Sequence, residues 1–198
     1  MTSIFDYLVK PKGERYNNSI DLGEGKELIL NTEISNHQFI NRVGIVLKTP
    51  LYGKTDIQPG DEVTLHHNVF RRWYDAKGRE KNSRAFISED TYLAQPDQVF
   101  LTRRQGEEWR ALEGFTFVQP LVNDNRFDFS AEKECVGVVK YSDGVFNVGD
   151  IVGYTPSSSF EFIVGEDRLY RVMNKFITIN YGIQRNERTY NPSWAKSS

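Results

Sequence analysis

The sequence predicts an all-β protein of 198 residues, and two observations support this prediction. Short runs rich in β-branched and aromatic residues recur along the chain, as in Val43–Leu47, Glu62–Leu65 and Asp150–Tyr154. Turn-forming residues interrupt these runs at close intervals, as at Pro59-Gly60-Asp61 and Asp143-Gly144. Many short strands with regular turns are typical of sandwiches and small barrels.

Each expected strand is an apolar or β-branched run bounded by polar or turn-forming residues. In chain order these runs are 28–30, 43–47, 62–65, 99–101, 115–118, 136–139, 150–154 and 176–179. The clearest helix candidate is the short segment 107–112, in which two acidic residues precede Trp109, Ala111 and Leu112.

The composition excludes several classes of protein. The 25 basic and 27 acidic residues give a formal net charge of −2, which provides no general attraction to nucleic acid or to an anionic membrane. A single cysteine, Cys135, excludes an internal disulfide framework and a cysteine-rich zinc site. The chain has no apolar run of about 20 residues and no signal-peptide pattern at its start. We therefore expect a cytoplasmic protein without metal or cofactor.

The most informative feature is an internal repeat, with copies at 25–104 and 113–182. Val43–Lys48 in the first copy corresponds to Val136–Tyr141 in the second, and a Gly-Asp turn follows each of them, at Gly60-Asp61 and Gly149-Asp150. A third pair of blocks leads into 99–101 and 176–179. Each copy also has an upstream apolar strand, expected at 27–31 and 115–118. Glycine permits the tight reversal in each turn, and the aspartate can accept hydrogen bonds from nearby amides.

This repeat predicts five segments along the chain. Residues 1–24 form an N-terminal arm, 25–104 the first small barrel, 105–112 a linker, 113–182 the second small barrel, and 183–198 a polar C-terminal tail. The linker is expected here because it is charged and contains glycine.

The ordered set of blocks resembles the GroES-type co-chaperonin family, most closely over Cys135–Tyr181. There Val136–Val139 resembles the family's Gly-x-Val strand, and Val148-Gly149-Asp150-Ile151-Val152 resembles its Val-Gly-Asp-x-Val turn. The resemblance implies two tandem GroES-like β-barrels, as in a viral or divergent member. It also implies a non-enzymatic protein that forms a homo-oligomeric ring and caps the folding cavity of a GroEL-type chaperonin.

In this family a long, glycine-rich loop precedes the Gly-x-Val strand and carries a branched aliphatic triplet that docks on the chaperonin. The expected equivalents here, Thr32–Asn41 and Val122–Glu134, are short and lack that triplet. We therefore expect the partner-binding residues to be Phe39 and Ile40 in the first copy and Phe127 and Phe129 in the second. The alternative is that these side chains fold back and plug the barrel ends.

Two other functions compete with the co-chaperonin. The same barrels could build a structural ring or a shell of a virus particle without any chaperonin, which would locate the protein in a host cytoplasm or a virion. The basic, aromatic segment Arg71-Arg72-Trp73 could contact a single strand of nucleic acid. A hairpin tip whose Trp73 covers its own base is the expectation we favour over that contact. For catalysis, Cys135 has no histidine partner that the sequence identifies.

Overall fold

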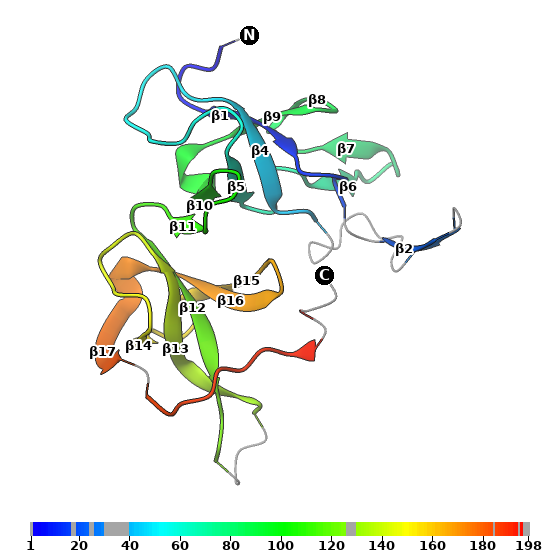
Figure 1. The fold of residues 1–198 in the computed structure, drawn as a ribbon. Coiled ribbons are helices and arrows are strands. Elements are labelled where there is room, and N and C mark those ends of the chain that lie inside the picture. Colours follow the sequence, from blue (N-terminus) through cyan, green and yellow to red (C-terminus); the bar gives the residue numbers. More distant parts are fainter. Residues whose placement is uncertain are drawn as a thin grey trace. The chain divides into compact units, whose positions relative to one another are not determined.

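The computed structural model describes residues 2–16, 19–23, 26–29, 40–125, 130–183, 185–193 and 195. The chain divides into two compact units, Met1–Glu108 and Trp109–Ser198, and their boundary lies within the expected linker 105–112 (Figure 1). The all-β class is confirmed: strands dominate the described residues, and the 3-10 helices Pro96–Gln98 and Asn174–Phe176 have only three residues each. The helix expected at 107–112 is absent, and the short strand β11 (Arg110–Ala111) lies there instead.

The first unit is built on one antiparallel sheet. Its strands are β1 (Tyr7–Pro11), β4 (Val43–Lys48), β5 (Glu62–Leu65), β8 (Phe86–Ser88), β9 (Thr91–Ala94) and β10 (Val99–Arg103), and their order in the sheet is β10-β5-β4-β1-β9-β8. Two separate hairpins are inserted into this unit: β2 (Ser19–Gly23) with β3 (Lys26–Ile29), and β6 (Arg72–Tyr74) with β7 (Glu80–Asn82).

The second unit has a six-stranded antiparallel sheet. Its strands are β12 (Phe115–Val122), β13 (Glu132–Ser142), β14 (Asp150–Tyr154), β15 (Ser159–Val164), β16 (Asp167–Met173) and β17 (Ile177–Ile183), in the order β15-β16-β12-β13-β14-β17. Six strands of the first unit follow the same order, β8-β9-β1-β4-β5-β10. Each unit also has a 3-10 helix directly before its last strand, β10 or β17.

The internal repeat is confirmed by the register of equivalent strand pairs. Gly44 lies opposite Val63 across β4 and β5, and Gly137 lies opposite Val152 across β13 and β14. The two turns also match, because the Gly60 N–H donates to the Val46 carbonyl at 2.7 Å and the Gly149 N–H donates to the corresponding carbonyl of Val139 at 2.9 Å. Both turn glycines have positive φ, 97° and 93°, which a side chain would strain.

The same positions supply the core of each unit. Val9, Val46 and Val63 are at most 1% exposed in the first unit. The equivalent residues of the second unit are Val118, Val139 and Val152, and they are also at most 1% exposed. Because side chains alternate across a strand, equal register directs the same repeat positions inward in both units.

The structure corrects the expected start of the first copy. The strand equivalent to β12 is β1, since Pro11 lies opposite Gly44 as Pro120 lies opposite Gly137. Residues 7–11 therefore belong to the first sheet rather than to an N-terminal arm, and Tyr7, Leu8 and Val9 are at most 5% exposed. The strand expected at 27–31 overlaps β3 of the inserted hairpin. This correction lengthens the segment between the two equivalent strands of the first unit to 12–42.

Two further expectations need revision. Neither large sheet closes on itself within the described part of the chain, so the closed barrels are not confirmed. The C-terminal segment is not simply a polar tail, because Thr189 forms an antiparallel bridge with Leu121 of β12 and Ala195 is fully buried.

Candidate functional site

The clearest candidate interface is the edge strand β17 of the second unit. On one side β17 pairs with β14, and no described strand pairs with its other side. Ile179, Tyr181 and Ile183 are 49%, 59% and 76% exposed. An apolar edge strand with a free side is a template for pairing with another chain.

The equivalent strand of the first unit has the opposite environment. In β10, Val99, Phe100 and Leu101 are at most 1% exposed. The difference arises although both strands have the same place and register, with Leu101 opposite Thr64 and Ile179 opposite Gly153. Of the two equivalent strands β10 and β17, β17 is therefore the one with exposed apolar side chains.

Gly153 of β14 leaves room for the Tyr181 ring of β17. A β-carbon on Gly153 would lie 3.2 Å from Cε2 of the Tyr181 ring, so the absence of a side chain gives the ring its space. On the other face, Asn180 Nδ2 donates to Asp150 Oδ2 at 3.0 Å. These contacts hold β17 beside its sheet neighbour β14, while the apolar side chains of β17 remain exposed.

A second exposed apolar cluster lies in the first unit. The amides of Leu51 and Tyr52 donate to the carbonyls of Ser3 and Ile4 at 3.1 and 2.9 Å. The Phe5 and Tyr52 rings lie 6.1 Å apart. Ile4, Phe5, Leu51 and Tyr52 are 52–66% exposed. The β4–β5 connection is thereby fixed to the chain's N-terminal residues with its apolar groups outward.

The four expected partner-binding residues are placed only in part. Phe39, Phe127 and Phe129 lie outside the described residues. Ile40 is 3% exposed and forms an antiparallel bridge with Tyr16, so it belongs to the interior of the first unit. With β1 as the first strand, the long segment 12–42 also contains the run Leu28-Ile29-Leu30, for which the sequence predicts a strand of the sheet itself. Aligning residues 7–11 with the start of β12 indicates that this run lies between the two strands rather than in one of them.

The basic hairpin β6–β7 is braced by its own unit. Arg15 donates to the Phe70 carbonyl (2.7 Å), the Arg71 carbonyl (3.1 Å) and Asn82 Oδ1 (2.8 Å). Burial lowers the pKa of the Arg15 guanidinium from its ordinary value. These bonds fix both ends of the hairpin to residues near β1.

Within that hairpin, the proposed nucleic-acid residues have internal partners. Arg72 forms an ion pair with Glu80 at 3.2 Å and lies over the Tyr16 ring. The Arg71 guanidinium lies 6.0 Å from the centre of the Trp73 ring. Arg72 thus pairs across its hairpin and against Tyr16, and Arg71 lies near Trp73 of the same hairpin. These contacts reduce the part of both side chains that could bind a phosphate backbone.

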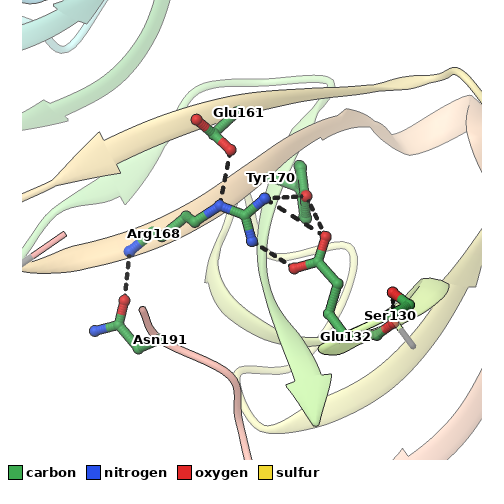
Figure 2. A network of polar contacts seen from close by, with 6 residues as sticks. All are labelled: Ser130, Glu132, Glu161, Arg168, Tyr170 and Asn191. Carbon is green, nitrogen blue, oxygen red and sulfur yellow. Dashed lines mark hydrogen bonds and ion pairs between the residues drawn. The ribbon is translucent and has the colours of Figure 1, made fainter. Parts of the chain in front are cut away.

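A polar cluster in the second unit joins β13, β15 and β16 (Figure 2). The Arg168 side chain is 12% exposed, and it donates to Glu132, to the Tyr170 hydroxyl and, at 2.7 Å, to Glu161. The Tyr170 hydroxyl donates to Glu132 Oε1 at 2.5 Å. Burial, followed by the bond to Glu132, raises the pKa of Tyr170 to about 12. All four groups are satisfied by one another, so the cluster is suited to holding strands together.

The described residues offer no other obvious chemical site. His66 and His67 lie directly after β5 with their rings stacked 4.3 Å apart. No group of three His, Cys, Asp or Glu side chains suitable for a metal ion occurs among them. Within the same residues, no helix has the length and apolar character needed to cross a membrane.

Comparison with known proteins found no relative. No protein-family model, no curated protein and no solved structure matches the chain.

Proposed function

We propose that the protein is a co-chaperonin-like ring component with two GroES-like modules in one chain. The observation that carries the proposal is the segment 12–42, which lies between β1 and β4, the strands equivalent to β12 and β13. The GroES-type resemblance expects its docking loop at this point. The segment contains three glycines and the aliphatic run Leu28-Ile29-Leu30.

The revised strand assignment moves the proposed docking element. Leu28, Ile29 and Leu30 replace Phe39, Ile40, Phe127 and Phe129 as the residues that contact the chaperonin. The corresponding segment of the second unit, 123–131, is short and contains no such triplet. Each chain would therefore present one docking element for its two modules.

Assembly would supply the affinity that one loop lacks. Burying one aliphatic side chain contributes roughly 1.5–3 kcal/mol before ordering costs, and several linked loops multiply weak contacts. The exposed edge of β17 supports association, since pairing it with a strand of a neighbouring chain would satisfy its free backbone groups. A ring made this way contains an even number of modules, because every chain contributes two.

The test is binding to a purified GroEL-type chaperonin in the presence of ATP. The parent protein should comigrate with the chaperonin in size-exclusion chromatography. A variant with Leu28, Ile29 and Leu30 all changed to Ser should lose binding at least about tenfold, the loss expected when apolar contacts worth a few kcal/mol are removed.

The matched control changes Val145→Ser and Val148→Ser, two side chains 65% and 69% exposed in the second unit. It should bind as the parent does. A parent protein that forms rings and yet binds no chaperonin would overturn this proposal and favour the structural ring or shell instead.

A further inference from the structure

The C-terminal segment pairs with the part of β12 beyond its pairing with β16. Strand β16 pairs with β12 over Phe115–Val118 only. Beyond that point the Val122 N–H donates to the Arg188 carbonyl at 2.8 Å, and the Tyr190 N–H donates to the Pro120 carbonyl at 2.7 Å. Figure 1 shows this segment in red beside the far end of β12.

Asn191 clips the same segment to the β15–β16 hairpin. The Arg168 N–H donates to Asn191 Oδ1 at 3.1 Å, and Asn191 Nδ2 donates to the Glu166 carbonyl at 2.9 Å. In Figure 2, Asn191 lies at the backbone of Arg168, the residue whose side chain holds Glu132. Arg168 therefore connects the C-terminal segment to β13: its backbone N–H bonds Asn191, and its side chain bonds Glu132.

The region under this segment is the base of the β12–β13 hairpin. Val122 lies opposite Glu132, and the Asn123 N–H donates to the Ala131 carbonyl at 3.1 Å. An open hollow of about 280 Å³ lies beside the segment, with Ser130, Glu132, Tyr190 and Pro192 in its lining. The segment is thus held at the hairpin base by a few discrete hydrogen bonds.

We propose that residues 185–193 are a strap that closes the β12–β13 hairpin onto the β15–β16 hairpin, with Asn191 and Arg168 as its latch. Opening of the hairpin base requires the strap to leave. The groove that the strap fills, between β12 and the β15–β16 turn, is a binding site for an extended segment of this sequence. This inference is independent of chaperonin binding.

Hydrogen exchange on the full chain tests the strap. The double variant Tyr190→Pro/Asn191→Ala removes the N–H that binds Pro120 and the side chain that binds Arg168 and Glu166. Exchange at Val122 and Asn123 should accelerate about tenfold or more, because local opening no longer breaks those bonds. Exchange at Val138 and Val152, in the centre of the sheet, should stay within about twofold of the parent.

The matched control is Arg188→Ala, which keeps the strap's backbone bonds and removes only an ion pair to Asp124 between side chains 73% and 66% exposed. It should exchange as the parent does. A chain ending at Ile183 should show the same acceleration, and a peptide of residues 184–198 added in solution should restore protection at Val122. Unchanged exchange at Val122 in the double variant, or equal acceleration throughout the unit, or no effect of the peptide, would overturn the proposal.

Discussion

A β-carbon placed on Gly137 would lie 2.7 Å from the carbonyl oxygen of Gln119, closer than real β-carbons approach backbone. Strands β12 and β13 therefore meet at a point where only glycine fits. The equivalent glycine of the first unit, Gly44, faces the Lys10 carbonyl in the same way, at 3.1 Å. Glycine within a strand often marks such close backbone approach.

Replacing this glycine should separate the two strands. Gly137→Ala is expected to lower the free energy of unfolding by about 1–3 kcal/mol, the usual cost of overpacking. Chemical denaturation followed by circular dichroism measures the change. Gly44→Ala is the comparison, and it should cost less because its nearest neighbour is the movable Leu65 Cδ1 at 2.9 Å. A Gly137→Ala protein as stable as the parent contradicts the close approach.

Arg15 should be essential to the placement of the β6–β7 hairpin. Arg15→Met removes the guanidinium donor of the Phe70 carbonyl and one of the two donors of the Arg71 carbonyl, which also accepts from the Ser83 N–H at 3.1 Å. It should lower the free energy of unfolding by about 1.5–3 kcal/mol, as for a hydrogen bond to a charged group. Exchange at Trp73 and Lys81 should rise as well. The control Arg79→Met removes an exposed pair with Asp75 and should change little. Equal effects of the two variants would show that the hydrogen bonds of Arg15 do not hold the hairpin in place.

The exposed edge of β17 predicts an oligomer. Changing Ile179→Lys and Ile183→Lys places charges along the free edge, a substitution that blocks edge-to-edge pairing. Sedimentation velocity at micromolar concentration should show an assembled parent and a monomeric variant, and the variant should still fold because both side chains are exposed in the single chain. Val148→Lys, equally exposed on the β13–β14 turn, should remain assembled. A monomeric parent would rule out this interface.

The phenol of Tyr170 should make stability depend on pH at alkaline values. Its pKa is raised from 10.0 to about 12 by burial and by Glu132, so the folded state favours the neutral phenol. This contribution is fully present below pH 10 and is lost as the pH rises toward 12. Tyr170→Phe should therefore show a shallower fall in unfolding free energy across that interval, measured by denaturation at a series of pH values.

Glu132→Gln provides the internal check on this assignment. Removing the negative charge beside the phenol should bring one tyrosine titration to lower pH in the ultraviolet absorbance of phenolate. An unchanged titration, or the same slope with pH in Tyr170→Phe and parent, would assign the alkaline loss of stability to other groups.

Local chemistry was sufficient to predict much of the repeat. The turns at Gly60-Asp61 and Gly149-Asp150 follow from residues that tolerate positive φ and accept amide hydrogen bonds. The strands after them follow from runs of β-branched residues. These features depend on neighbouring residues alone, so the sequence indicated the order of the blocks and the all-β class.

The first strand and the C-terminal strap were missed for a different reason. The run Tyr7-Leu8-Val9 is too short to distinguish a core strand from an arm, and residues 185–193 are polar. Each becomes part of a sheet only through distant partners, β4 and β9 for β1 and β12 for the strap. The candidate docking run Leu28-Ile29-Leu30 was misassigned in turn, since its role depends on which strand precedes it.

The residues alone predict a twofold repeat of short strands with Gly-Asp turns, because strand and turn preferences act over a few neighbouring positions. The folded arrangement decided which equivalent strands are covered. Val99–Leu101 and Ile177–Ile179 are similarly apolar and occupy the same position in their sheets, yet the first is buried and Ile179 is 49% exposed. Burial depends on what distant parts of the chain lie against a strand, and that information is absent from the strand itself.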